Sequence, residues 1–227
     1  MAPSSSTYGA RHRAITIRSS GPVRVAAVNS NSSWQRPLSS SVRHACQFVK
    51  YAAFFRNLNL GRLNCPTKVQ FEDAFAGVGA NSVASFQTNG TMIFTSASNA
   101  QARRILAGAR ATLRDMCGLK EPAYLRSIEY LNGLAALNPF AAVEPDSVYE
   151  RCTSFLHPSV SELPELPIES KRGDVQLLKF TGTEVLSVSL KVGSSPGSPN
   201  AFLEKLLGLP VTTRSWSTVT RIVERHG

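Results

Sequence analysis

Hydrophobic positions in the first half of the chain predict strands and helices in turn. Residues 48–55 are apolar at nearly every position, which is typical of a strand buried on both faces. A loop follows, and then a helix whose apolar stripe begins after Thr67, which forms a capping box with Gln70. Gly79 is expected to end this helix, because glycine readily adopts the left-handed conformation found after helices.

A hairpin, a second helix and a further strand complete this half. Residues 83–87 and 91–95 have strand-like patterns, and Asn89-Gly90 between them favours a two-residue type I′ turn. Residues 98–118 form a long helix, capped by a serine and closed by a glycine, and 122–126 form the next strand. This order of elements is that of a split βαβ, ferredoxin-like unit.

The second half also mixes helices with strands. Ser127 caps a helix, and strand patterns follow at 148–156, 175–180 and 184–191. Two short helices end the chain. Ser198 caps the first of them, and Thr212 or Thr213 caps the second.

We therefore expect an α+β protein of two ferredoxin-like (split βαβ) lobes, with mixed or antiparallel sheets and helices packed on one face. The first lobe is expected over residues 46–126 and the second α+β lobe over 127–227.

Most of the positive charge lies in a Ser- and Arg-rich extension. Residues 1–45 hold six arginines and no Lys, Asp or Glu, so they carry +6 of the net charge of +10. They show no apolar periodicity, so we expect a disordered N-terminal extension. A transit peptide and a start site assigned too far upstream both remain open for it. The rest of the chain has an ordinary charge, which argues against a specific nucleic-acid partner.

Cysteine and histidine are too few and too scattered for a metal site. The four cysteines, Cys46, Cys65, Cys117 and Cys152, show no paired spacing, and His157 is the only histidine between residues 46 and 225. No metal or cofactor is expected. The apolar runs are shorter than the ~20 residues of a membrane span, so we expect a cytoplasmic protein with no membrane partner.

Several short motifs resemble an uncharacterised, mostly bacterial family, domain of unknown function 1697. That family's pattern has an RGINVGG loop, a QSGN hairpin, an RS pair, an NPF and a C-terminal TTRNWNTV. In this chain they correspond to Arg56–Arg62, Thr88–Thr91, Arg126-Ser127, Asn138–Phe140 and the segment Asn200–Val219. The resemblance covers about residues 48–222 and supports the fold; it implies no function, because the family's own role is not established.

This chain departs from the family's pattern at several motif positions. Asn57 and Arg62 replace glycines of the loop, and Gly197 replaces the lysine before the C-terminal motif. Ser215 and Ser217 replace its two asparagines. Ligand binding by these segments therefore need not match that of other members.

The candidate site is an anion site at the start of the helix after residue 198. Unpaired N–H groups and the helix dipole favour anions there, although a plain strand-to-helix connection requires the same small residues. We expect Arg214 either to contact the anion or to bridge a carboxylate such as Glu204. The candidate residues are Arg56, Asn57, Asn59, Gly193, Ser194, Ser195, Ser198, Thr213 and Arg214.

The function expected from the sequence is that of an accessory protein that binds a small anionic ligand or nucleotide in a cleft between the lobes. The alternatives are a protein-interaction or dimerisation module without a ligand and, third, an enzyme of unknown class. No catalytic residue is assigned, because no G-x-S-x-G elbow occurs and His157 would have to serve any nucleophile. The sequence leaves the oligomeric state open.

Overall fold

The computed structural model describes residues 48–144 and 148–227; the predicted extension, 1–45, lies outside them. The described residues form five helices and eleven strands. The helices are α1 Lys68–Ala76, α2 Asn99–Cys117, α3 Ile128–Ala136, α4 Pro199–Leu207 and α5 Trp216–His226. The strands are β1 Val49–Phe55, β2 Asn81–Phe86, β3 Thr91–Ser96, β4 Ala123–Ser127, β5 Glu150–Phe155, β6 Ile168–Glu169, β7 Val175–Phe180, β8 Glu184–Ser189, β9 Lys191–Val192, β10 Ser195–Pro196 and β11 Thr212–Ser215. The predicted α+β class is confirmed.

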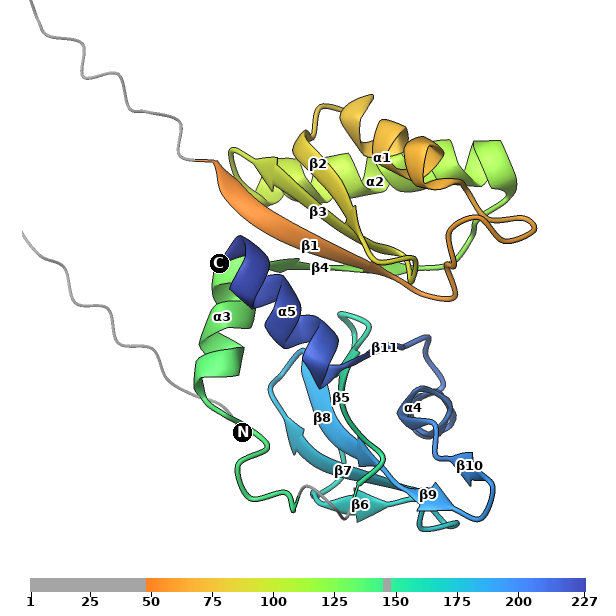
Figure 1. Cartoon of the computed structure of the whole chain (residues 1–227), viewed down its shortest axis with the longest axis vertical. Coiled ribbons are helices and arrows are strands. Elements are labelled where there is room, and N and C mark those ends of the chain that lie inside the picture. Colours follow the sequence, from red (N-terminus) through yellow and green to blue (C-terminus); the bar gives the residue numbers. More distant parts are fainter. Residues whose placement is uncertain (1–47, 145–147) are drawn as a thin grey trace, which may run out of the picture. The chain divides into compact units, whose positions relative to one another are not determined.

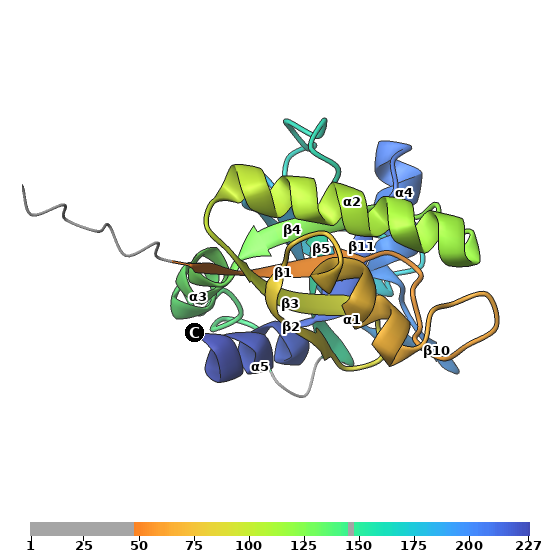
Figure 2. The same cartoon turned by 90° about the horizontal axis from the view of Figure 1, so that it is seen from above.

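The first sheet has the strand order β2-β3-β1-β4, and each neighbouring pair is antiparallel. β1 lies inside this sheet, and its side chains alternate between two buried faces. Tyr51 and Phe55 pack with α1 and α2 on one face, whereas Ala52 and Phe54 face the other way. Figures 1 and 2 show both helices over that first face. The prediction of a strand buried on both faces is therefore confirmed.

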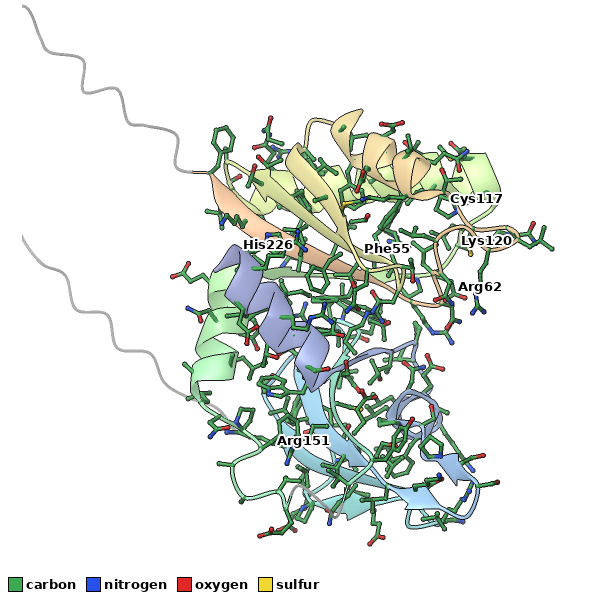
Figure 3. All side chains as sticks on the ribbon, in the orientation of Figure 1. Phe55, Arg62, Cys117, Lys120, Arg151 and His226 are labelled. Carbon is green, nitrogen blue, oxygen red and sulfur yellow. The ribbon has the colours of Figure 1, made fainter. Side chains whose placement is uncertain are left out.

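Helices α3 and α5 cover the second face of the first sheet. Side chains of α3, together with Val219 and Ile222 of α5, belong to the core cluster around Phe54. Lys50 Nζ also donates a 2.8 Å hydrogen bond to the carbonyl of His226, which fastens the end of α5 beside β1 (Figure 3). The expectation of helices on one face is wrong for this sheet, because the apolar residues on both faces of β1 each require a cover.

The second sheet has the order β11-β5-β8-β7-β6 and is antiparallel throughout. One of its faces packs against Leu203 of α4. The other packs against Leu134 of α3 and against Trp216, which begins α5. Phe155 of β5 instead stacks on Phe54 of the first sheet, with ring centroids 4.0 Å apart. Helices α3 and α5 thus contact both sheets.

The two sheets share one strand order. The first has β4-β1-β3-β2, and the second has β11-β5-β8-β7 with β6 added at its edge. Helices α1 and α2 make the two crossovers of the first sheet, and α4 makes the crossover into β11. Residues 156–174, between β5 and β7, contain only the short strand β6 and no helix. Prolines at 158, 164 and 167 disfavour a helix in this segment, because proline lacks the N–H that a helix requires.

Two local predictions are wrong. β2 and β3 are joined by the four residues 87–90, with φ of +60° at Gln87 and +69° at Gly90, so the hairpin has no two-residue type I′ turn at Asn89-Gly90. The segment Thr212–Ser215 is a strand paired with β5, and Ser215 rather than Thr212 or Thr213 caps α5. In both places a neighbouring strand fixes the backbone.

Gly197 occupies a position that has no room for a side chain. A Cβ atom there would lie 1.9 Å from the carbonyl oxygen of Asp174. We expect Gly197→Ala to lower the free energy of unfolding by about 1–3 kcal/mol, because the backbone must shift to relieve the clash. Urea denaturation measures this loss.

Gly133 in α3 provides the matched control. A Cβ atom there meets no atom within 4 Å. Gly133→Ala should stabilise the protein by about 0.5–1 kcal/mol, because alanine favours the helix. Equal effects of the two substitutions would contradict this account of Gly197.

Candidate functional site

The guanidinium of Arg214 lies where the first sheet meets β11. Its Nη2 donates to the carbonyl oxygens of Phe55 (2.8 Å) at the end of β1 and of Asn89 (2.7 Å) in the loop between β2 and β3. Its Nη1 donates to the hydroxyl of Thr212 and to the carbonyl of Thr213, and its Nε donates to Thr91 Oγ1. Every N–H of the guanidinium therefore has an acceptor within the chain.

Arg214 is a buried cation without an ion-pair partner in the described part of the chain. The residue is only 8% exposed, and all its side-chain acceptors are carbonyl or hydroxyl oxygens. Burial lowers the pKa of Arg214 to about 10, which still leaves the group charged at neutral pH. The expected bridge from Arg214 to a carboxylate such as Glu204 is absent from the described residues; Arg214 instead bridges backbone carbonyls.

A pocket of about 350 Å³ opens beside this guanidinium. We call it the asparagine pocket, because four of its lining residues are asparagines. It is lined by Phe55, Asn57, Leu58, Asn59, Asn89, Ser198, Asn200, Thr212, Thr213 and Arg214. None of these residues is acidic, so the pocket combines amides and hydroxyls with one buried positive charge.

Two of the amides are available to a ligand. Asn57 and Asn59 are exposed, and their side chains have no hydrogen bond within the described residues. Asn57 adopts a φ of +51°, a left-handed conformation that asparagine tolerates better than most residues. Ser198 already caps α4 by accepting from the N–H of Ala201, and Thr213 shares a 2.8 Å hydrogen bond with Ser154.

Arg56, at the head of the same loop, is held by carboxylates instead. Its Nε and Nη2 donate to the two oxygens of Glu204 at 2.6 Å and 3.0 Å, and its Nη1 pairs with Glu121. The hydrogen bond to Glu204 raises the pKa of Arg56, and the same bond lowers the pKa of Glu204. Arg56 does not line the pocket, and two carboxylates pair with its single positive charge.

The glycine and serine loop also lies apart from the pocket lining. Gly193 and Ser194 form the turn between β9 and β10, and Ser195 is the first residue of β10. All three are exposed, and none lines the asparagine pocket. The small residues that indicated an anion loop thus make a tight hairpin, in which Gly193 has a φ of +70°.

The structure brings together five of the nine sequence candidates: Asn57, Asn59, Ser198, Thr213 and Arg214. It adds Asn89, Asn200 and Thr212, which the sequence analysis did not select as site residues. All three lie in segments that carry the family resemblance, but nothing in their local sequence singles them out.

The described residues hold neither a metal cluster nor a membrane-spanning helix. Over residues 48–144 and 148–227, no three His, Cys, Asp or Glu side chains gather where they can hold a metal ion. No helix in these ranges combines the length and apolar character needed to cross a bilayer.

Comparison with known proteins supports the family resemblance. Residues 48–185 match the model of a family described as protein of unknown function, DUF1697. No curated protein sequence matches the chain. The fold is similar to that of conserved bacterial protein SP0830 from Streptococcus pneumoniae, with 19% identity and a TM-score of 0.54 over 78% of this chain and 98% of that one.

Removing the Arg214 guanidinium should destabilise the protein without any ligand. Arg214→Ala leaves the carbonyl of Asn89 without its donor, and it leaves the carbonyl of Phe55 with only the 3.4 Å hydrogen bond from Thr212. We therefore expect the free energy of unfolding to fall by about 3 kcal/mol or more. Arg214→Lys should lose most of this stability, because an ammonium lacks the planar fork. The exposed Arg225 is the control, and Arg225→Ala should cost less than about 1 kcal/mol in the same urea titration.

The carboxylate of Glu204 should make stability depend on acid pH. Its pKa is lowered in the folded protein, so its stabilisation is complete above the ordinary pKa of 4.5 and is lost as pH falls through the lowered value. Glu204→Gln should therefore reduce stability at pH 7 and flatten the loss between pH 5 and pH 3. The exposed Glu224 provides a Glu→Gln control, and an equal acid loss in Glu204→Gln and the parent would contradict the role of the pair.

Proposed function

The chain belongs to the DUF1697 family of proteins of unknown function, and we propose that it binds a small anionic ligand in the asparagine pocket. The observation that carries this proposal is the buried charge of Arg214, which no carboxylate neutralises in the described residues. No catalytic residue is proposed, and the ligand is bound rather than transformed.

The field of Arg214, rather than a free donor, attracts the anion. All its N–H groups are used within the chain, so it acts as a fixed positive charge at the pocket wall. A unit negative charge roughly 6 Å away gains about 3 kcal/mol at an effective dielectric constant of about 20. The amide groups of Asn57 and Asn59 then supply N–H donors to the anion's oxygens.

The lining of the pocket also supports the proposal. Three of the segments that resemble the family's motifs contribute to it: the loop 56–62, the hairpin 88–91 and the C-terminal stretch 200–219. These segments are far apart in the sequence. The revised site therefore keeps Asn57, Asn59, Ser198, Thr213 and Arg214. It replaces Arg56 and the Gly193 turn by Asn89 and Asn200.

Two further proposals concern the plan of the two sheets and the location of the protein in the cell. We interpret both sheets as variants of one split βαβ plan, the second lacking its first crossover helix; the shared strand order supports this. We also propose a reducing, cytosolic location, supported by the free thiols of Cys65, Cys117 and Cys152. Location of a tagged chain in an oxidising compartment would overturn the second interpretation.

A thermal-shift screen against phosphate, sulfate and small carboxylates tests the proposed function. A ligand at a hundred times its Kd should stabilise the protein by about 2.7 kcal/mol, or roughly 5–10 °C. Asn59→Asp should abolish that shift, because it places a negative charge in the pocket with almost no change in shape.

Asn64→Asp is the matched control. Asn64 is exposed in the same loop but does not line the pocket, so this variant should keep the shift. Loss of the shift in both variants would indicate a general charge effect and would contradict the assigned site. No stabilisation by any anion in the parent protein would favour the interaction module that binds no ligand.

A further inference from the structure

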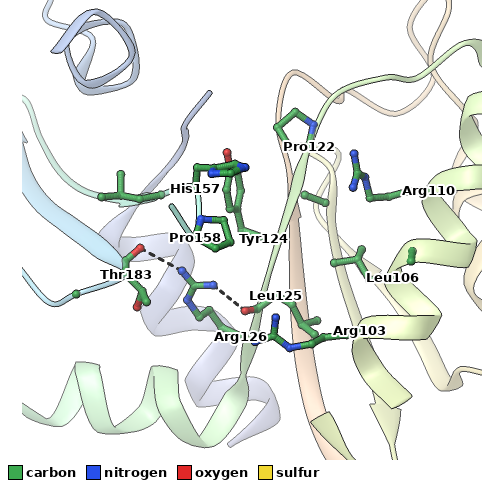
Figure 4. Close-up of a pocket in the computed structure, with 14 residues that line it drawn as sticks. Arg103, Leu106, Arg110, Pro122, Tyr124, Leu125, Arg126, His157, Pro158 and Thr183 are labelled. Atoms are coloured by element: carbon green, nitrogen blue, oxygen red, sulfur yellow. Dashed lines mark hydrogen bonds between the residues drawn. The ribbon is translucent and has the colours of Figure 1, made fainter. Parts of the chain in front are cut away.

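A second cleft, of about 450 Å³, lies between the first sheet and the second (Figure 4). On one side it is lined by α2 and by β4, which is the edge strand of the first sheet. On the other side lie the residues after β5 and the turn between β7 and β8. It shares no lining residue with the asparagine pocket. We call it the arginine cleft.

Two arginines of α2 bring uncompensated charge to this cleft. Arg103 and Arg110 are seven residues apart, so they share one side of the helix about 10 Å apart along its axis. No carboxylate pairs with either of them in the described residues. Arg110 reaches only the carbonyl of Glu121, at 3.5 Å, and its buried Nε has no partner there.

Arg126 has a different role in the same cleft. Its guanidinium pairs with the fully buried carboxylate of Glu184 and donates to the carbonyls of Leu125 and Thr183. Its donors are therefore directed to the chain, and it forms a wall of the cleft. Figure 4 shows it bridging β4 and Thr183.

One end of the cleft carries a histidine. His157 Nδ1 lies 2.7 Å from Ser159 Oγ, so Nε2 is left for a ligand. In Figure 4, Arg110, Pro122 and His157 lie toward one end of the cleft, and Arg103 lies toward the other. Arg110 and His157 together suit a phosphate group, because a guanidinium donates two parallel hydrogen bonds to phosphate oxygens.

The walls between these ends are largely apolar. Leu106 and Leu125 lie on the side of the first sheet, and Leu156 and Pro158 lie on the other. No acidic residue lines the cleft. The volume of the cleft falls in the range of small-molecule sites. Along α2, the charged end at Arg110 is separate from the apolar middle of the cleft.

We propose that the arginine cleft binds a phosphate ester with a planar apolar body, of the size of a mononucleotide. The phosphate lies between Arg110 and His157, and the planar body packs along Leu125 and Pro158. The guanidinium of Arg103 stacks on that body, as guanidinium groups do on aromatic rings. This site is separate from the one in the proposed function.

Calorimetric titration of the full chain with adenosine 5′-monophosphate tests this inference. The nucleotide should bind, and adenosine and inorganic phosphate should each bind at least about tenfold more weakly, because each lacks half of the contacts. Arg110→Ala should raise the Kd at least about tenfold, and Arg110→Lys should raise it too, because an ammonium keeps the charge but loses the fork. Arg103→Ala should raise it by a smaller factor.

Arg104→Ala is the matched control, since Arg104 is exposed on the same helix but does not line the cleft. It should leave the Kd unchanged, and so should Asn59→Asp, which alters the asparagine pocket. No binding at 10 mM nucleotide, or equal weakening by Arg104→Ala and Arg110→Ala, would overturn the site. Equal affinity for ribose 5-phosphate would overturn the stacking of the planar body.

Discussion

The hydrogen bonds of the buried Arg214 hold the two halves of this protein together. One guanidinium on β11 donates to the last residue of β1, to the β2–β3 loop and to β3, so it fixes three parts of the first sheet against the edge of the second. A cation buried this deeply requires an acceptor for each N–H, and the chain provides carbonyls and hydroxyls. Strand β11, which pairs with β5, places the guanidinium beside these acceptors, and Arg214 also forms part of the wall of the asparagine pocket.

A second polar contact joins the halves elsewhere. Glu184, which is fully buried at the start of β8, accepts hydrogen bonds from Arg126 of β4 and from Tyr130 of α3. Buried polar contacts of this kind fix the geometry between two elements more strictly than apolar packing does, because both distance and direction are constrained. The two proposed sites lie beside these two contacts. Both therefore have walls that the fold itself holds in place.

The sequence predicts the elements whose signals are local. Thr67 and Ser198 cap their helices as expected, and Gly118 ends α2 in the left-handed conformation. The hairpin loop at 87–90 and the strand Thr212–Ser215 were not predicted, because both contact distant segments. The carbonyl of Gly90 accepts a hydrogen bond from the N–H of Phe55, and Thr212–Ser215 pairs with β5. Propensity within a short window contains no information about such partners.

The same distinction applies to the candidate site. Asn57 and Asn59 were selected because they lie in a loop that resembles a family motif, and the structure places both on the pocket. Asn89 and Asn200 are 111 positions apart in the numbering and meet only through the fold. The Gly193 segment was selected for its composition, which tight turns and anion loops have in common.

The packing of α5 on the first sheet has a consequence for the order of folding during synthesis. Val219 and Ile222 are fully buried in the cluster that contains Ala52 and Phe54 of β1. The part of this face that α3 does not cover therefore stays exposed until residues 216–226 have left the ribosome, although the strands of that sheet are made much earlier. An apolar face exposed for that interval is a binding surface for chaperones, and the early half of the chain completes its core only when the late half arrives.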